Sequence, residues 1–212
     1  MKKFIIVLFI VVMIWGCTKE QATTKFAEIS FNVDQSQLAE EYICSDTGIS
    51  FHPPKNWEQI SSELLISVKE NLIASKDTSD INIVPLNVFM NMEKSFTCFL
   101  STFDNELLTK DICDNYINEF RMKNQDLSIN EGSYSHNGLD FHQFIFTKDD
   151  HITIKLITKV NNQKIIMIDY IVPSKNYEEE LRAIESSIGS IKKQKNEIGL
   201  SNKADSQKEK NS

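Results

Sequence analysis

The stretch that decides the fold is residues 127–173, LSINEGSYSHNGLDFHQFIFTKDDHITIKLITKVNNQKIIMIDYIVP. Apolar and polar side chains alternate along it in four runs, the pattern of strands with one buried face. The runs are separated by His136-Asn137-Gly138, Lys148-Asp149-Asp150 and Asn161-Asn162, and Asn-Gly is the strongest short hairpin signal. The stretch therefore predicts a meander of four antiparallel strands, over residues 127–134, 139–147, 151–160 and 164–172.

Three amphipathic helices are predicted around this meander. Pro173 ends the last strand, and Ser174 then caps a helix whose apolar stripe is Tyr177, Leu181, Ile184 and Ile188. A second helix, about residues 106–123, carries the stripe Leu108, Ile112, Tyr116 and Phe120, widened by Cys113 and Ile117. A third begins at Ser61 or Ser62 and places Leu64, Leu65, Val68, Leu72 and Ile73 on one face.

Shorter strands are predicted before and between the helices. Ile49 and Phe51 alternate with polar neighbours, and Pro53-Pro54 stops that strand because proline cannot donate to a ladder. Residues 84–104 predict two strands joined by a hairpin at Glu93-Lys94. On the first strand one face carries Leu86, Val88, Met90 and Met92. On the second strand one face carries Phe96, Cys98, Leu100 and Thr102. The order of elements predicts an α+β fold in which helices pack on an antiparallel sheet.

The segment 47–57, TGISFHPPKNW, resembles the opening of PsbP-like domains, a family named after the photosystem extrinsic subunit. The strand ending at Pro173, followed by Tyr177 and a helix ending in residues 187–191, SIGSI, is similar to their close, except that Ser190-Ile191 stands where Ser-Phe is usual. The resemblance covers residues 42–192. It implies an α/β/α sandwich with a central, mainly antiparallel sheet and about three helices, and a mostly non-catalytic role as assembly factor, scaffold or lipoprotein.

The N-terminal stretch Met1–Cys17, MKKFIIVLFIVVMIWGC, has the layout of a secretory signal: two lysines, an apolar run and a small residue before the cysteine. The apolar run is shorter than the roughly 20 residues of a membrane-spanning helix. Ile14-Trp15-Gly16-Cys17 resembles the lipobox of bacterial lipoprotein precursors, whose cysteine is diacylated and becomes the new N-terminus. Trp15 departs from the small residue usual there. The alternatives are an uncleaved N-terminal anchor and a signal peptide whose cysteine is incidental.

This interpretation divides the chain into four parts. Residues 1–16 are a lipoprotein signal peptide, and residues 17–40 are the lipidated Cys17 with a polar tether. The second half of this tether can pair as a first strand through its apolar residues Phe26, Ile29, Phe31 and Val33. Residues 41–192 form the PsbP-like α+β domain. Residues 193–212 are a disordered polar tail, because apolar residues nearly vanish there.

The charge of the chain disfavours nucleic acid as a partner. The formal net charge is −7, and loss of residues 1–16, which hold Lys2, Lys3 and no acid, makes it −9. From Lys192 onward six lysines outnumber three acids, so the remainder of the mature chain carries about −12. An acidic body repels phosphate backbones, so the lipid on Cys17 is the expected contact with the membrane.

Three cysteines remain after Cys17, namely Cys44, Cys98 and Cys113, and none of the spacings is CxxC. Cys98 lies on a strand pattern and Cys113 on a helix pattern, so both are expected to be small buried apolar residues. A Cys98–Cys113 disulfide is the alternative, and an odd number of thiols leaves at least one free.

No catalytic or cofactor motif is present: the chain has no GxGxxG, P-loop or GxSxG sequence. The four histidines, His52, His136, His142 and His151, form no metal-ligand spacing and are expected at the surface or satisfied in strands. The group that most resembles a site is Asp149-Asp150-His151, which a hairpin turn also explains. Trp57 is either a core residue or an exposed anchor for a partner, and the core is favoured.

The sequence predicts a lipid-anchored protein of a bacterial cell envelope, non-catalytic, that acts as a binding or scaffold module toward an unknown envelope protein. Thr18 follows Cys17 where Asp would signal inner-membrane retention in enteric bacteria; this favours the outer membrane in a cell with two. The alternative is an exported hydrolase or small-ligand-binding protein whose site is assembled from distant residues around His142 or His151. No catalytic, cofactor-binding or metal-ligating residue is assigned.

Overall fold

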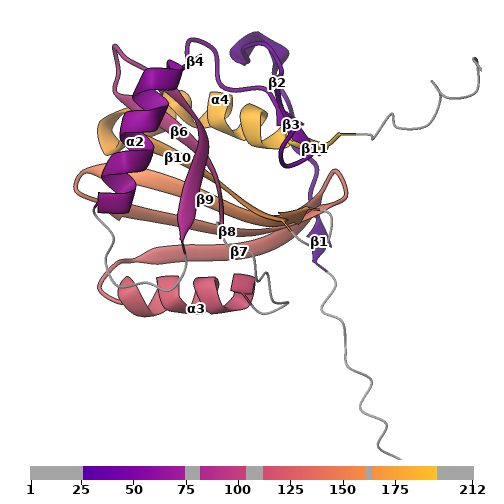
Figure 1. The fold of residues 1–212 in the computed structure, drawn as a ribbon. Helices are drawn as coiled ribbons and strands as arrows, with labels where there is room; N and C mark the ends of the chain where they lie inside the picture. Colours follow the sequence, from indigo (N-terminus) through magenta and orange to yellow (C-terminus); the bar gives the residue numbers. More distant parts are fainter. Residues whose placement is uncertain (1–25, 75–81, 104–111, 161–163, 195–212) are drawn as a thin grey trace, which may run out of the picture.

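The structure, a computed structural model, describes residues 26–74, 82–103, 112–160 and 164–194 (Figure 1). Cys17, Leu108, the Asn161-Asn162 turn and the tail from residue 195 lie outside the described residues. No helix among the described residues is long and apolar enough to cross a membrane.

An eight-stranded, mainly antiparallel sheet forms the body of the protein, in the order β1-β7-β8-β9-β10-β6-β5-β4. Its strands are β1 (Ala27–Glu28), β4 (Glu58–Gln59), β5 (Ile83–Asn91), β6 (Phe96–Phe103), β7 (Ile129–His136), β8 (Leu139–Lys148), β9 (His151–Val160) and β10 (Lys164–Pro173). A three-stranded sheet, in the order β11-β3-β2, consists of β2 (Tyr42–Cys44), β3 (Ile49–Phe51) and β11 (Lys192–Lys193).

The predicted meander is confirmed as β7, β8, β9 and β10, each paired antiparallel with the next. Asn137 and Gly138 both have positive φ, as a two-residue type I′ hairpin turn requires. Asp149 and Asp150 also have positive φ, in the turn between β8 and β9. The alternation of the sequence and its turn chemistry specify the same register, which explains why these boundaries were predictable.

The pairing of β10 with β6 brings the meander beside the predicted hairpin of β5 and β6. Phe96, Cys98 and Leu100 share a buried cluster as expected. On β5 the predicted face is confirmed in part: Leu86 packs against the main core cluster and Val88 is 1% exposed, but the register shifts between Pro85 and Asn87. This irregularity moves Phe89, instead of Val88, into the main core cluster.

The α/β/α sandwich is confirmed, with helix α3 (Ile112–Lys123) and helix α4 (Tyr177–Gly189) on opposite sides of the sheet (Figure 1). The main cluster packs Ile184 and Ile188 of α4 against the sheet, together with the small sheet. The second cluster packs the predicted stripe of α3 against the other face. Ser174 begins a 3-10 turn, Ser174–Asn176, before α4, so the predicted cap at Ser174 is wrong.

Helix α2 (Ser62–Ala74) follows β4 and contacts β5. Its start is as predicted, because the Ser61 hydroxyl accepts a hydrogen bond from the Leu64 N–H at 3.3 Å. The predicted apolar face is only partly covered: Leu64 is 55% exposed and Leu72 44%. The helix therefore contacts β5 while part of its apolar face stays exposed.

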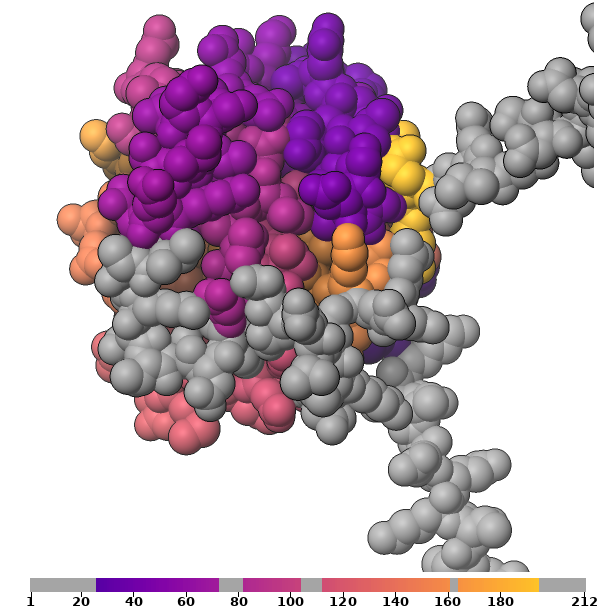
Figure 2. All heavy atoms as spheres, viewed as in Figure 1, coloured from indigo at the N-terminus to yellow at the C-terminus, as the bar shows by residue number. Residues whose placement is uncertain are grey.

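Residues 26–40, here called the N-terminal strap, pack against the folded domain, and β1 confirms the expectation that the second half of the tether segment pairs as a first strand. β1 pairs in parallel with β7 at Tyr134 and Ser135. Phe31 packs against the main core cluster. Further along, a 3-10 turn (Gln35–Gln37) leads to the buried Leu38, which bridges to Pro54. The last described strand, β11, pairs with β3, so the C-terminal end of the described chain lies beside the small sheet (Figure 2).

Candidate functional site

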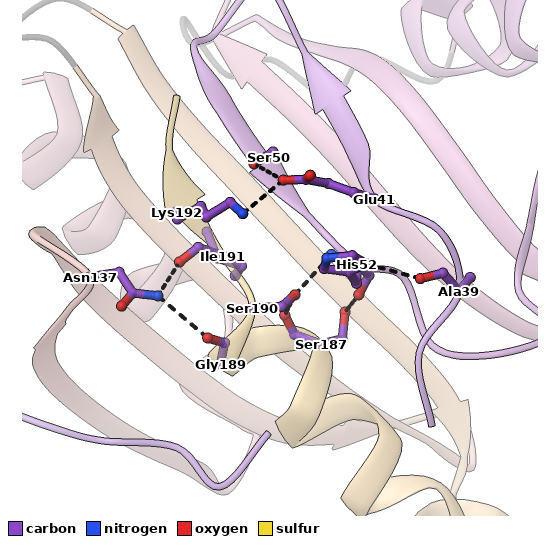
Figure 3. A network of polar contacts seen from close by, with 10 residues as sticks. All are labelled: Ala39, Glu41, Ser50, His52, Asn137, Ser187, Gly189, Ser190, Ile191 and Lys192. Atoms are coloured by element: carbon purple, nitrogen blue, oxygen red, sulfur yellow. Dashed lines mark hydrogen bonds and ion pairs between the residues drawn. The ribbon is translucent and has the colours of Figure 1, made fainter. Parts of the chain in front are cut away.

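A polar network joins the strap, the small sheet and the end of α4 (Figure 3). The His52 backbone N–H donates to Ser190 Oγ at 2.8 Å, and Ser187 Oγ donates to the His52 carbonyl at 2.6 Å. The buried Tyr170 hydroxyl shares a hydrogen bond with Ser187 Oγ at 2.8 Å, and His52 Nδ1 lies 3.0 Å from the Ala39 carbonyl. These groups satisfy one another, so the network is a structural joint between distant segments.

The same joint continues through an ion pair at the surface. Glu41 accepts a hydrogen bond from Ser50 Oγ at 2.6 Å and pairs with Lys192 Nζ at 3.0 Å. The hydrogen bond from Ser50 and then the Lys192 ammonium hold the pKa of Glu41 below its usual value. The contact ties β11 to Glu41, the residue that follows the strap, and to β3, where Ser50 is buried although the sequence pattern placed it on the polar face.

His136 connects the strap to the C-terminal end of α4. Its Nδ1 lies 2.9 Å from the Ile29 carbonyl and its Nε2 lies 2.9 Å from the Gly189 carbonyl. The neighbouring Asn137 amide donates to the Ile191 carbonyl at 2.8 Å. His136 therefore holds two chain segments together, and both of its ring nitrogens have hydrogen-bond partners, as expected for a histidine in a strand.

His142 lies on β8 with a serine beside it. Ser133 Oγ is 2.9 Å from His142 Nδ1, and the ring of Phe26 meets the His142 ring edge-on at a centroid distance of 5.4 Å. Burial is the largest influence on the ring and lowers the pKa of His142 below its usual value. Asp114 and Glu131 oppose that shift, whereas Arg121 and Lys159 reinforce it. The neutral ring therefore dominates near neutral pH.

We expect this neutral histidine to make the domain less stable in mild acid. Below about pH 6.5 the unfolded chain binds a proton at residue 142 that the folded ring binds only at lower pH, so the free energy of unfolding falls as pH falls. Urea unfolding between about pH 7 and pH 5 should show a smaller pH dependence for His142→Gln than for the natural chain. Equal pH dependence in the two chains would contradict this assignment.

His151 and its two aspartates form the predicted turn, at the rim of an open depression of 790 Å³. The depression lies between that turn, the β5–β6 hairpin and the start of α4, and Lys94 and Lys175 also line it. His151 Nδ1 lies 2.8 Å from the Asp149 carbonyl of its own turn. Among the described residues no group of three histidine, cysteine, aspartate or glutamate side chains is arranged to hold a metal ion.

The charged group that the sequence analysis missed is a buried ion pair under α3. Lys155 Nζ on β9 lies 2.8 Å from Asp169 Oδ2 on β10, and the two side chains are only 10% and 18% exposed. The ammonium also lies 6.0 Å from the centre of the Tyr116 ring and 5.8 Å from that of Phe120. Burial is the largest single influence and lowers the pKa of Lys155, but the Asp169 carboxylate and the Tyr116 hydroxyl together raise it by more, so the pKa lies above its usual value and the lysine stays charged. Only the pairing of β9 with β10 reveals this contact.

The cysteines and the tryptophan are core residues. Cys44, Cys98 and Cys113 are free and buried, and Cys98 and Cys113 belong to separate clusters. The expectation that both are buried is therefore confirmed, and the alternative disulfide between them is wrong. Burial raises the pKa of the Cys98 thiol, which keeps it protonated. Trp57 is 2% exposed, as favoured, although its Nε1–H has no hydrogen-bond partner among the described residues.

No protein-family model matches the chain, and no curated protein matches it. The solved structures that resemble the chain include the following three. Cyanobacterial PsbP (CyanoP) from Synechocystis sp. PCC 6803 has a TM-score of 0.45 and 11% identity, over 74% of this chain and 93% of that one. A Bacteroides thetaiotaomicron VPI-5482 protein has a TM-score of 0.42 and 14% identity, over 75% and 50%. A Pseudomonas aeruginosa protein of unknown function has a TM-score of 0.38 and 9% identity, over 71% and 94%.

This chain spans half the length of the Bacteroides protein and nearly all of the other two. Identities of 9–14% with TM-scores below 0.5 say nothing about what this chain binds or does. The fold class stands on the chain's own sheet and helices.

Proposed function

We propose that this chain is a lipid-anchored protein of a bacterial cell envelope, that its domain is PsbP-like, and that it acts by binding an envelope protein without catalysing a reaction. The observation that carries the proposal is the stretch Met1–Cys17, which combines two lysines, a short apolar run and a Gly-Cys end. More than one acyl chain is needed for stable anchoring, and a diacylated Cys17 meets that condition. Thr18 after the cysteine favours the outer membrane in a cell that has two.

The position of the domain along the chain supports this arrangement. The described fold begins at Phe26, so eight residues separate it from Cys17. Eight residues reach at most roughly 26–29 Å when extended. A lipid on Cys17 would therefore keep the domain close to the membrane surface, where it can meet a partner held in the same membrane.

The replacement Cys17→Ser tests the anchor. We expect the natural chain to incorporate labelled fatty acid and to sediment with membranes, whereas Cys17→Ser should lose the label because serine offers no thiol for acylation. Cys44→Ser is the matched control: its thiol is buried in the folded domain, so the label should remain. Fatty-acid label on the Cys17→Ser chain would refute the lipidation site.

The same cells test the binding role. In-cell crosslinking of the tagged natural chain should capture a specific envelope protein, and the yield should fall in Cys17→Ser, which no longer concentrates the domain at the membrane. Turnover of a small molecule by the purified chain, without a captured partner, would favour the enzyme alternative.

One contact favours that alternative, namely the 2.9 Å separation of Ser133 Oγ and His142 Nδ1. A serine nucleophile also needs a third group that orients the histidine, and donors for the oxyanion. The ring of Phe26 also packs edge-on against the ring of His142. For these reasons the binding role is the function we propose.

A further inference from the structure

The first described residue lies on the side of the sheet that carries helix α3. The Phe26 ring meets the His142 ring edge-on at a centroid distance of 5.4 Å, and His142 Nδ1 lies 2.9 Å from Ser133 Oγ. Side chains alternate along a strand, so Ser133 and Glu131 of β7 point to the same face of the sheet. Glu131 accepts a hydrogen bond from Arg121 Nε of α3 at 2.9 Å. Phe26 therefore lies on the α3 side, and α4 lies on the other side (Figure 1).

Helix α3 presents an uncharged face to the solvent. Its buried stripe packs against the sheet. Asn115, Asn118 and Met122 follow one another at spacings of three and four residues, so they share the face opposite that stripe, and all three are exposed. Met122 is 70% exposed, although its side chain is large and apolar. The outward face of α3 therefore combines two amides with an apolar side chain.

The charged side chains that flank this outward face are paired. On one flank Arg121 forms an ion pair with Glu131 of β7, and on the other flank Lys123 Nζ lies 2.9 Å from Glu119 Oε1. The helix as a whole has two acidic and two basic residues, Asp114, Glu119, Arg121 and Lys123, so its net charge is zero. An anionic surface that approaches this face therefore meets little net charge.

The other two described helices carry negative charge. In α4 four glutamates outnumber one arginine, which gives a net charge of −3: Glu178, Glu179, Glu180, Glu185 and Arg182. In α2 two glutamates outnumber one lysine, which gives a net charge of −1. Of the three described helices, α3 is therefore the one that anionic lipid repels least.

We infer that the outward face of α3 is the part of the domain that rests on the membrane, with Met122 among the lipid headgroups. The inference rests on the proposed anchor at Cys17, because the lipid there holds the domain at the surface. The eight residues between Cys17 and Phe26 reach at most roughly 26–29 Å. A helix with its side chains is roughly 10–12 Å across. The tether is therefore long enough for α3 to lie between the sheet and the membrane.

This orientation gives the two sides of the domain different roles. The interface between water and lipid accommodates an exposed, unbranched apolar side chain such as that of Met122. The acidic first turn of α4 then faces away from the membrane, where an envelope protein can reach it. The lipid on Cys17 supplies the attachment, and α3 supplies the orientation.

Two exposed methionines provide matched positions for a fluorescent label. Met122→Cys places a thiol on the outward face of α3. Met92→Cys places one in the turn between β5 and β6, where the natural side chain is 75% exposed and where Lys94 pairs with Glu179 of α4. The three natural thiols of the domain are buried, so a thiol-reactive fluorophore should label the introduced cysteine.

The measurement uses the labelled chain as the cell produces it, reconstituted in vesicles of phosphatidylethanolamine and phosphatidylglycerol that contain a spin-labelled lipid. We expect the spin label to quench the fluorophore at residue 122 about twofold or more, and the one at residue 92 very little, because only the first lies at the lipid interface. A fluorophore on Asn115→Cys should lose its quenching when Met122→Glu adds a negative charge to the same face. It should keep its quenching when Met92→Glu adds the charge elsewhere.

Equal quenching at residues 92 and 122, or no quenching at residue 122, in a chain that floats with the vesicles would overturn the inference and leave the anchor in place. Emission at residue 122 that depends on protein concentration and not on the spin-labelled lipid would also overturn it, because a second copy would then cover α3. A chain that carries no fatty acid and does not float would remove the anchor, and this inference with it. Flotation and quenching therefore separate the two failures.

Discussion

Replacing Asp169 by asparagine is expected to lower the free energy of unfolding by roughly 3–5 kcal/mol, because an uncompensated ammonium would remain in the core. Asp169 Oδ2 is 2.8 Å from Lys155 Nζ, and the rings of Tyr116 and Phe120 surround the same ammonium from α3. Small domains are commonly stable by about 5–15 kcal/mol in total. The variant should therefore be close to unfolding, and urea denaturation followed by circular dichroism measures the loss.

Two controls separate the buried charge from other effects. The double replacement Lys155→Met with Asp169→Leu removes both charges and should recover most of the stability, since apolar residues of similar size often replace a buried pair without loss. The exposed pair of Lys123 and Glu119 on α3 provides the second control. Glu119→Gln should cost about 0.5 kcal/mol or less. A cost for Asp169→Asn no larger than that of Glu119→Gln would contradict the prediction.

Replacing Gly189 by alanine is expected to destabilise the domain by about 1–3 kcal/mol and to loosen the N-terminal strap. A Cβ at this position would come within 2.5 Å of Phe31 Cβ and 2.8 Å of Val33 Cγ2. Phe31 Cβ is next to the backbone, so the strap itself must move. Limited proteolysis should then cut residues 26–34 faster, and urea denaturation should show the loss of stability.

Gly132→Ala is the matched control. Nothing lies within 4 Å of its added Cβ, and the residue lies in a strand. The change should leave stability within about 0.5 kcal/mol or raise it slightly, because alanine restricts the unfolded chain. If Gly189→Ala behaves like Gly132→Ala, the strap does not pack on α4 as described. The strap is also held there by Asp34, whose N–H donates to Ser186 Oγ at 3.1 Å and whose carboxylate pairs with Arg182 at 3.0 Å.

The residues of the candidate site were predictable one by one, but their contacts were not. The turn at Asp149-Asp150, the buried Trp57 and the free buried thiols follow from local pattern and residue type. His136 looked like any strand histidine, yet it lies between the Ile29 and Gly189 carbonyls. Those two residues are far from His136 in sequence, so no local pattern could indicate them.

Sequence alone determined the meander β7–β10 and the buried stripes of α3 and α4. In these elements buried residues recur with the period of the helix or the strand that carries them. The residues at the hairpin turns can adopt the positive φ that such turns require. Only the tertiary structure decided which strands lie side by side: β10 with β6, β1 with β7 and β11 with β3. It also decided the irregularity in β5 and the buried Lys155–Asp169 pair. These features join segments that are far apart in the sequence. Bringing such segments together costs chain entropy, which contacts over the whole domain offset, so no repeating pattern within one segment indicates them.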